Sequence, residues 1–387
     1  MKKIKVAVLF GSRSVEHEVS IVTAMEVFAA MDKEKYEAVP IYIDKQGRWN
    51  TGKDLDKLES FMNLELVAKN KLVECMLPAV VGQKSLVLME SGQGMPSEID
   101  IVFPALHGTY GEDGTLQGLL EMTGIPYVGC GVGAAAVGMD KVMQKAVFEK
   151  EGIPIVRYEW FMDWEWSDRK EELVTKLEKN LGYPMCVKPA NLGSSVGINF
   201  AKDRVELEWA VEVAKEFDRK ILIEEGLVGI DEINCSVMGV DELEVSVCEQ
   251  PIKTDKVLTY EEKYLLGGKT KGMAGLARLL PAPIPDRLRD KIQNYAKMAF
   301  RAIGAAGLSR IDFLVDIKRE IVYINEINTL PGGLSFYIWE KSGYTYAQVV
   351  DKLIALGFER HAKMNKLQRS FDTKLLKTSS GGAKFQR

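Results

Sequence analysis

Strand-like and helix-like runs alternate over the first third of the chain, and this pattern restricts the fold more than any other feature. Residues 3–12, KIKVAVLFGS, form an apolar run that ends in glycine, and residues 17–31 repeat apolar side chains at helical spacing. Further strand-like runs follow at 36–44 and 99–108, and a helical pattern at 113–124 is closed by glycine. Strands that alternate with helices predict an α/β domain built on a parallel sheet.

The composition changes near Gly129, where a segment rich in small residues, GCGVGAAAVGMDK, precedes a Lys/Glu-rich helical stretch. A length of 387 residues suits two or three domains. We therefore predict domains at 1–129, 130–228 and 229–360, followed by a basic tail at 361–387. The tail carries seven Lys or Arg and one Asp, which is typical of a solvated, partly disordered extension.

Charge and cysteine usage narrow the class of protein. A net charge of −4 gives no reason to expect nucleic acid as the main partner. No apolar stretch reaches transmembrane length, so no membrane association is expected, and the apolar run after the first lysines is too short for a signal peptide. The five cysteines lack metal-ligand spacing and suit a reducing compartment. These features predict a cytoplasmic protein.

The segment KPANLGSSVG, residues 188–197, contains a lysine and then mostly small residues, directly after an apolar strand-like run. Small residues let backbone N–H groups approach an anion closely, and a nearby lysine adds positive charge. Gly and Ser clusters are also the commonest composition of ordinary loops. The segment taken alone therefore fits a phosphate-binding loop and a plain surface loop equally well.

Two strand-like runs near the C-terminus carry polar residues two positions apart. RIDFLVD places Arg310 and Asp312 on one side of a strand, and INEINT does the same for Glu326 and Asn328. Oxygen donors of this kind suit Mg²⁺, which also takes phosphate oxygens and water. The alternatives are two half-exposed strands with a polar face, or an Arg310 that simply pairs with the acids. A phosphate-binding loop elsewhere in the chain favours the metal site.

Seven blocks of the sequence together resemble the D-alanine–D-alanine ligases of the ATP-grasp superfamily. In chain order they are LFGSRSVEHEVS, ALHGTYGEDGTLQGLLEMTGIPYVGCG, MDK, VKPANLGSSVG, YEEKY, RIDFLVD and NEINTLPG, and the similarity runs to about residue 360. The resemblance implies a three-domain ATP-grasp fold with a Rossmann-like N-terminal domain. It also implies a homodimer and a reaction in which ATP phosphorylates one D-alanine and the amine of a second attacks the acyl phosphate.

The resemblance assigns residues to ATP and metal. It implies two Mg²⁺ ions, with Mn²⁺ as a substitute, on Asp312, Glu326 and Asn328. ATP-binding positions are Lys141, Lys188, Ser195, Glu224, Leu227, Glu232 and Lys263. Without the neighbouring blocks, Lys141 reads as an exposed helix lysine. Glu225 beside Glu224 leaves the adenine assignment open between the two.

The resemblance also assigns residues to the substrate and the reaction. The catalytic positions are Glu16, Ser194, Tyr264, Arg310 and Gly332, and the substrate-binding positions are His107, Ser335 and Tyr337. Glu16 matches the residue that takes the ammonium group of the first D-alanine, although Glu18 could share that site or both could cap a helix. Tyr264 could equally be an aromatic strand residue, and the segment around Gly332 a simple turn.

The sequence departs from the family where the second amino acid is expected to bind. The family continues with MTxxSLxP after NTxPG, whereas this chain has GLSFYIWEKSG. Tyr337 therefore stands where a serine contacts the carboxylate of the second D-alanine, and Trp339 adds bulk. The loop at 265–278 is also longer than usual. The leading hypothesis is a D-alanyl-D-alanine ligase of peptidoglycan synthesis; the alternatives are a ligase for another second amino acid or a nucleotide-binding protein without catalysis.

Overall fold

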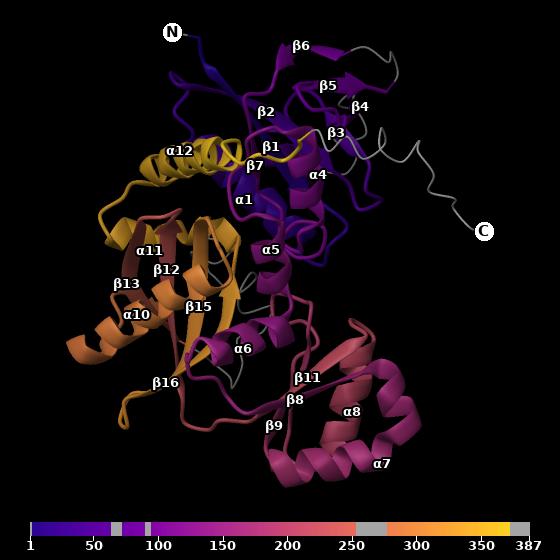
Figure 1. Cartoon of the computed structure of the whole chain (residues 1–387), viewed down its shortest axis with the longest axis vertical. Coiled ribbons are helices and arrows are strands. Elements are labelled where there is room, and N and C mark those ends of the chain that lie inside the picture. Colours follow the sequence, from indigo (N-terminus) through magenta and orange to yellow (C-terminus); the bar gives the residue numbers. More distant parts are fainter. Residues whose placement is uncertain (1, 63–71, 90–93, 253–276, 372–387) are drawn as a thin grey trace, which may run out of the picture.

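The computed structural model describes residues 2–62, 72–89, 94–252 and 277–371. These residues form three sheets, and each sheet carries its own helices (Figure 1). The first elements along the chain are β1 (Ile4–Gly11), α1 (His17–Ala30), β2 (Tyr36–Ile43), β3 (Trp49–Thr51), α2 (Glu59–Met62), β4 (Val73–Met76), β5 (Ser85–Leu88), β6 (Gly94–Glu98), β7 (Ile101–Pro104), α4 (Thr115–Thr123), α5 (Val132–Met139) and α6 (Lys141–Lys150). Ala134 of α5 and Phe148 of α6 pack in the core of the C-terminal sheet.

The N-terminal sheet has the strand order β6-β5-β4-β3-β2-β1-β7. The long strand β1 pairs in parallel with both β2 and β7, as the alternation of strands and helices predicts. The strands β3 to β6 are added in antiparallel pairing, so the sheet is mixed rather than wholly parallel. The helices expected at 17–31 and 113–124 are confirmed as α1 and α4, and Gly124 ends α4 at a φ of 70° that suits glycine.

The central sheet is antiparallel, with the order β10-β9-β11-β8. Its elements are β8 (Tyr158–Met162), α7 (Asp163–Asn180), β9 (Met185–Pro189), β10 (Asn199–Ala201), α8 (Arg204–Lys215) and β11 (Lys220–Glu225). Apolar residues of α7 and α8, including Leu177, Leu207 and Val211, pack with Val187 and Ile221 of the sheet in one core. We call residues 158–225 the central subdomain.

The C-terminal sheet is also antiparallel, with the order β14-β13-β12-β15-β16. Its elements are β12 (Asp231–Gly239), β13 (Leu243–Pro251), β14 (Arg278–Leu279), α10 (Asp286–Ala302), β15 (Gly307–Asp316), β16 (Ile321–Asn328), the 3-10 helix η2 (Gly332–Ser335), α11 (Phe336–Lys341) and α12 (Tyr346–Met364). The helix expected from Pro285 is confirmed as α10, whose apolar stripe of Leu288, Ile292, Ala296 and Ala299 packs on one face of this sheet.

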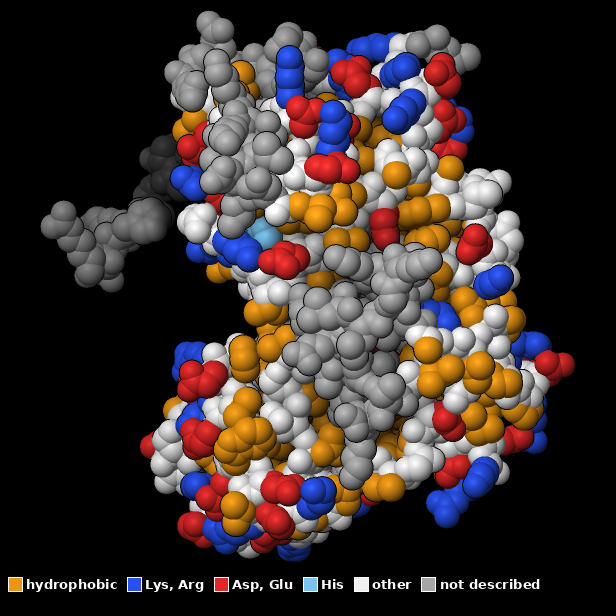
Figure 2. All heavy atoms as spheres, turned by 180° about the vertical axis from the view of Figure 1, so that it is seen from behind, with side chains coloured by type: hydrophobic (Ala, Val, Ile, Leu, Met, Phe, Trp, Pro, Cys, Tyr) orange, Lys and Arg blue, Asp and Glu red, His pale blue; other side chains and the backbone are white. Residues whose placement is uncertain are grey.

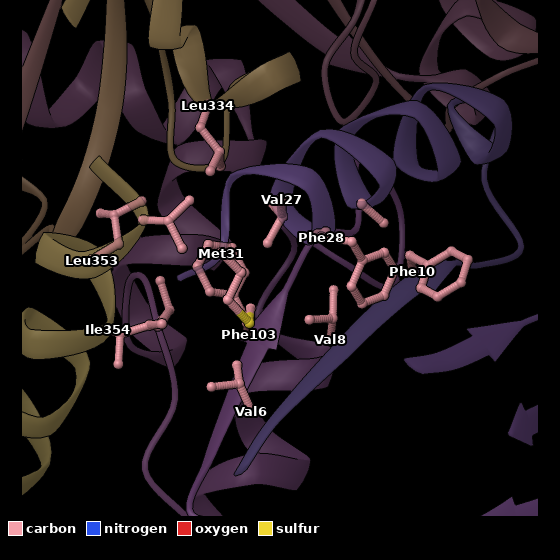
Figure 3. Close-up of a cluster of buried hydrophobic side chains, with 14 of the residues drawn as sticks. Val6, Val8, Phe10, Val27, Phe28, Met31, Phe103, Leu334, Leu353 and Ile354 are labelled. Atoms are coloured by element: carbon pink, nitrogen blue, oxygen red, sulfur yellow. The ribbon is translucent and has the colours of Figure 1, made fainter. Parts of the chain in front are cut away.

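Helix α12 joins the first and last sheets through a common core. Val6, Val8 and Phe10 of β1 and Val27 and Phe28 of α1 cluster with Leu353 and Ile354 of α12 and with Leu334 of η2 (Figure 3). We call these two sheets with their helices the shared body. Helix α12 continues to Met364, so it extends into the segment predicted as a basic tail.

Candidate active site

The polar face of the C-terminal sheet carries two rows of side chains that run across the strands. Register pairs Glu249 with Asn234, Asn234 with Asp312, and Asp312 with Glu326. Two residues further along, Ser236 pairs with Arg310, and Arg310 with Asn328. Side chains two positions apart point to the same face, and the intervening Cys235, Ile311 and Ile327 lie in the core under α10. The predicted sharing of one face by Arg310 and Asp312 is therefore confirmed.

Asp312 and Glu326 form a pair of carboxylates whose charges are balanced by cationic side chains. The Arg310 guanidinium donates to both Asp312 oxygens at 2.7 Å, and Asn328 Nδ2 donates to Asp312 Oδ2 at 3.1 Å. Lys141 Nζ lies 3.2 Å from Glu326 Oε2. Two adjacent carboxylates and an amide oxygen are donors that suit Mg²⁺. The residues present thus fit the predicted metal ions, and the pairing of Arg310 with an acid, the alternative raised by the sequence, also occurs.

A cavity beside Glu326 is lined by most of the residues predicted to bind ATP. Lys141, Lys188, Ser195, Glu224, Leu227 and Glu232 line it together with Asp312 and Glu326. The cavity lies between the central sheet and the C-terminal sheet, because Lys188 is on β9, Glu224 on β11 and Asp312 on β15. Lys141 begins α6 and is buried, so the reading as an exposed helix lysine is not what the structure shows.

Glu224 is the buried member of the Glu224–Glu225 pair. It is 2% exposed and forms ion pairs with Lys188 and Lys145, whereas Glu225 pairs with Arg157 at the surface. Burial opposes ionisation of Glu224, but the two ammonium groups outweigh it and lower its pKa to about 2. Lys145 is 1% exposed and its pKa is lowered by burial. Lys145 is not among the predicted site residues, although its position one helical turn after Lys141 on α6 places both lysines on the same side of that helix.

The loop after β9 connects the central subdomain to the N-terminal sheet. Ser194 and Ser195 have φ values of 54° and 60°, in the left-handed region. Ser194 Oγ donates to a carboxylate oxygen of Glu16, as the resemblance implies, and a Cβ on Gly193 would come within 2.5 Å of Glu16 Oε2. A larger side chain at Gly193 would push the Glu16 carboxylate aside, so the small residues of this loop permit its close contact with the first domain.

A second cavity adjoins the first and is lined by predicted catalytic residues and by His107, whereas Ser335 and Tyr337 line neither cavity. Glu16, His107, Ser194, Arg310 and Gly332 line it, and Lys141, Leu192, Gly193, Ser194 and Glu326 border both cavities. Glu112, which the sequence analysis did not select, also lies here and accepts N–H bonds from Gly108 at 2.7 Å and Leu330 at 3.1 Å. Burial, followed by the charge of Glu16, raises the pKa of Glu112 to about 8.

His107 holds the turn that carries Gly332. Its Nδ1 lies 2.8 Å from the Leu330 carbonyl oxygen, and its Nε2 lies 2.8 Å from Thr23 Oγ1. Thr23 Oγ1 in turn accepts from the Gly333 N–H at 3.1 Å. Burial lowers the pKa of His107 to about 4, so the neutral ring donates from Nδ1 and accepts at Nε2. The ring of bonds therefore encloses Pro331 and Gly332, and both imidazole nitrogens are used within the protein.

The residues predicted for the second amino acid are buried. Ser335 is fully buried, with a φ of 48°, and its hydroxyl has no hydrogen-bond partner among the described residues. Tyr337 is 7% exposed and donates to Glu249 Oε1 at 3.0 Å. Trp339 Nε1 donates to Ser236 Oγ at 2.9 Å. Lys263 and Tyr264 lie outside the described residues, as does most of the long loop at 265–278.

The structure also describes the cysteines, the helices and the surface charges on which the predictions from composition were based. The five cysteines are free and buried. Within the described ranges, no helix is both long and apolar enough to cross a bilayer. Figure 2 shows charged side chains of both signs distributed over the face of the molecule opposite to that of Figure 1. The tail beyond residue 371 lies outside the described part of the chain.

Comparison with known proteins places the chain among ligases. Sequence models of the D-ala D-ala ligase N-terminus and C-terminus match residues 5–130 and 147–355. A D-alanine–D-alanine ligase of Thermosipho melanesiensis is 42% identical over 379 residues, which cover 98% of this chain and 99% of that protein. A D-alanine–D-alanine ligase of Bacillus cytotoxicus is 40% identical, with coverage of 95% and 99%.

Solved structures agree. The VanG D-Ala:D-Ser ligase of Enterococcus faecalis superposes with a TM-score of 0.79 at 32% identity, covering 92% of this chain and 100% of that one. The D-alanine–D-alanine ligase of Coxiella burnetii superposes with a TM-score of 0.78 at 30% identity, covering 94% and 98%.

Proposed function

The chain belongs to the D-alanine–D-alanine ligase family and has the ATP-grasp fold, and from this premise we propose that it joins two D-alanine molecules. The reaction uses ATP and gives D-alanyl-D-alanine, ADP and phosphate for peptidoglycan precursor synthesis in the cytoplasm. The observation that carries the proposal is the contact between the two cavities. The cavity lined by Lys188 and Glu224 adjoins the cavity lined by Glu16 and Arg310, with Lys141 and Glu326 bordering both.

The first step activates a carboxylate, which is a poor electrophile. A carboxylate oxygen of the first D-alanine attacks the γ-phosphorus of ATP, so that a C–O–P linkage forms and ADP leaves. Lys141 and Lys188 hold the phosphate groups, and Glu224 and Glu232 contact the adenine and ribose. Asp312, Glu326 and Asn328 would hold two Mg²⁺ ions, which offset the negative charge of the phosphates. Without bound metal ions, Lys141 balances the charge of Glu326 and Arg310 balances the charge of Asp312.

The second step forms the peptide bond. The amine of the second D-alanine attacks the acyl carbon, the tetrahedral intermediate carries a negative oxygen, and phosphate leaves as the C–O bond breaks. Arg310 and the Gly332 N–H stabilise this oxyanion. His107 and Thr23 contribute through position, because their bonds to Leu330 and Gly333 hold the turn on which Gly332 lies.

Glu16 and the loop after β9 position the first D-alanine and exclude water. The Glu16 carboxylate takes the substrate ammonium group, and Ser194 donates to the same carboxylate. Burial keeps the neighbouring Glu112 protonated at neutral pH, because its pKa is raised to about 8, so one of the two acids carries the charge. Exclusion of water preserves the acyl phosphate, which otherwise hydrolyses. Lys263 and Tyr264, which resemble lid residues of the family, belong to the same proposal.

A second candidate is a ligase of the same chemistry that joins D-alanine to a different amino acid. The observation that favours it is the buried hydroxyl of Tyr337, which donates to Glu249 at the position where the family has a serine. A related structure is that of a D-Ala:D-Ser ligase. The first step is common to both candidates, so only the nucleophile differs.

The deciding experiment is ADP release coupled to mass detection of products, across D- and L-amino acids supplied singly and in pairs. D-Alanine alone should give D-alanyl-D-alanine in a reaction that requires Mg²⁺. Turnover only with D-alanine and a second amino acid would favour the second candidate. ADP release that is independent of every amino acid would reject both candidates and favour a nucleotide-binding protein without ligase activity.

A further inference from the structure

Glu249 lies at the far end of the polar row that contains the metal-binding acids. It is 1% exposed and pairs in register with Asn234, which pairs with Asp312. Adjacent strands lie about 4.8 Å apart, so Glu249 is about 10 Å from Asp312 on the same face of the sheet. Asp312 and Arg310 line the two cavities, and Glu249 lies two strands away from Asp312 on the same face of the sheet.

Three donors from different elements converge on Glu249. Arg278 Nη1 of β14 donates to Oε2 at 2.9 Å, and Tyr337 of α11 and Asn234 of β12 donate to Oε1 at 3.0 and 3.1 Å. A buried carboxylate with three donors is a fixed support for the groups that bind it. Asn234 is 2% exposed, and its Oδ1 has no hydrogen-bond partner within the described ranges. Because buried polar atoms are normally hydrogen-bonded, we expect a donor of a ligand or of a water molecule to bond to Asn234 Oδ1.

The guanidinium of Arg278 lies over the ring of Tyr337. The guanidinium carbon lies 3.8 Å from the centre of the Tyr337 ring, and the Arg278 side chain is 11% exposed. Helix α11 keeps the tyrosine in place, because Trp339 donates to Ser236 and the hydroxyl of Ser342 accepts from the Val247 N–H at 3.0 Å. The stacking and the bond to Glu249 together fix the plane of the guanidinium. A fixed guanidinium is the side chain best suited to bind a carboxylate with two parallel bonds.

The balance of charges on this face indicates what Arg278 binds. Each cation on this face has one acid as its partner: Arg310 pairs with Asp312, Arg278 with Glu249, and Lys141 with Glu326. Once Asp312 engages the metal and phosphate, the two guanidinium groups share one remaining carboxylate. That arrangement favours an incoming anion at the Glu249 end. The nucleophile of the proposed reaction is an amino acid, and its carboxylate is such an anion.

We propose that Arg278, positioned by Glu249 and Tyr337, binds the α-carboxylate of the second amino acid. The inference rests on the proposed function, to which it adds the group that recognises the second substrate. Arg278 is a substrate-binding residue, and Glu249 and Tyr337 are positioning residues. The side chain at 337 therefore acts through Arg278 and not by direct contact with the substrate, which explains how a tyrosine serves where the family has a serine.

The test is a competition between D-alanine and D-alaninamide in one reaction. D-Alaninamide has no carboxylate, so it acts only as the nucleophile, and mass spectrometry measures the ratio of D-alanyl-D-alanine to D-alanyl-D-alaninamide. This ratio depends on the second step alone. Arg278→Ala should lower the preference for the carboxylate by about 30-fold, a factor typical of a lost charge-assisted pair. The KM for ATP should stay within about twofold of the wild-type value.

Matched variants separate recognition from structural damage. Arg289→Ala removes an exposed arginine of α10 that pairs with Asp286, and it should leave the product ratio unchanged. Tyr337→Phe removes only the bond to Glu249 and should lower the preference by about threefold. Arg278→Lys keeps the charge but loses the two-bond geometry, and it should lower the preference by about tenfold. This variant decides the matter if Arg278→Ala does not fold.

An unchanged product ratio in Arg278→Lys and Arg278→Ala would overturn the inference. Failure of the proposed function would appear instead in the wild-type protein, as an absence of D-alanyl-D-alanine. If the wild-type protein joins D-alanine to another amino acid, the competition uses that amino acid and its amide, and the same ratios apply. If it forms no dipeptide at all, both the proposed function and this inference are rejected.

Discussion

The central subdomain and the shared body differ in how they are held together. In the shared body, β1, α1 and α12 meet in one apolar core, although α12 lies more than 300 residues after β1 (Figures 1 and 3). The central subdomain has a core of its own. Polar groups dominate its contacts with the rest of the chain, such as Lys188 with Asn325 at 3.1 Å, Lys141 Nζ with the Leu192 carbonyl at 2.8 Å, and Ser194 with Glu16.

This difference indicates that the shared body is rigid and that the central subdomain can move relative to it. Apolar burial makes the shared body one cooperative unit, so Arg310, Gly332 and Glu16 keep fixed positions relative to one another. The central subdomain contributes Lys188, Glu224 and the Ser194 loop across a polar boundary, with a small apolar cluster that includes Val142, Ala190 and Leu222 as the exception. Polar contacts exchange with water at little net cost. The arrangement suits a cover that closes over ATP and substrate and opens again.

The largest effect is expected at the boundary itself. Glu326→Gln should reduce turnover at least a thousandfold, because the carboxylate would hold metal and borders both cavities, and should leave the unfolding free energy of either region within about 1 kcal/mol of wild type. Steady-state ADP release and denaturant unfolding measure the two quantities. Glu320→Gln, at the exposed turn between β15 and β16, is the matched control. Normal turnover in Glu326→Gln would refute the metal assignment.

The next effect tests whether the two regions unfold separately. Leu353 is 1% exposed in the shared core and Leu207 is fully buried in the central core. Each change to alanine should cost about 2–5 kcal/mol. Leu353→Ala should shift the denaturant transition of the shared body to lower denaturant concentration. Leu207→Ala should shift only the unfolding of the central subdomain, which is monitored by the loss of ATP binding. A common shift of all probes by Leu207→Ala would show that the chain unfolds as one unit and would break the comparison.

A smaller, pH-dependent effect is expected within the shared body. Glu26 on α1 is partly buried, with its carboxyl against Gly333 of η2, and burial raises its pKa to about 7, above the value of 4.5 for a free glutamate. The folded protein therefore holds this proton when the unfolded chain has lost it. The resulting stability is complete below pH 4.5 and is lost as the pH rises to about 7, by up to about 3 kcal/mol.

Glu26→Gln should remove that loss. The free energy of unfolding of the variant, measured by denaturant titration between pH 5 and 8, should fall less steeply with pH than that of the wild-type protein. Glu18→Gln removes a charge from the exposed side of the same helix and serves as the control. Equal slopes for Glu26→Gln and wild type would contradict the assignment of this carboxyl to the shared core.

The smallest effect is expected for the bond that joins the central subdomain to the shared body when the site is closed. Ser194→Ala removes the bond from the central subdomain to Glu16 and should raise the KM for the first amino acid about tenfold, with less than about 1 kcal/mol lost in stability. Substrate titration and thermal unfolding measure these changes. Ser167→Ala, which removes an exposed hydroxyl from α7, provides the comparison. An unchanged KM would mean that the boundary closes without this bond.

The sequence predicts the elements of this molecule well where a single period governs them. Alternation at Arg310, Asp312, Glu326 and Asn328 predicts their common face, and helical spacing predicts α1 and α10. The antiparallel strands β3 to β6 were not predicted, because they are short and each has little pattern. The assignment of ATP, metal and substrate roles to single residues came from the resemblance to a family, and those roles remain predictions.

The residues that sequence reasoning missed are those whose importance depends on distant partners. Glu112 gains its raised pKa from burial against Glu16, almost a hundred residues earlier. Glu249 becomes a support only when Arg278 and Tyr337 reach it from β14 and α11. Neither position has a local signal, because a Glu in a turn, such as Glu112, or in a strand, such as Glu249, most often lies on a solvated face.

The hydrogen bonds around His107 set a limit on recombination between relatives. The turn at Gly332 is held by His107 and Thr23, which come from the opposite end of the chain. A chimera with a crossover anywhere between residues 107 and 330 takes His107 and Thr23 from one parent and the turn at Gly332 from the other. Libraries that exchange C-terminal halves to alter the second substrate should therefore carry α1 and the segment around His107 with them, as one inherited block.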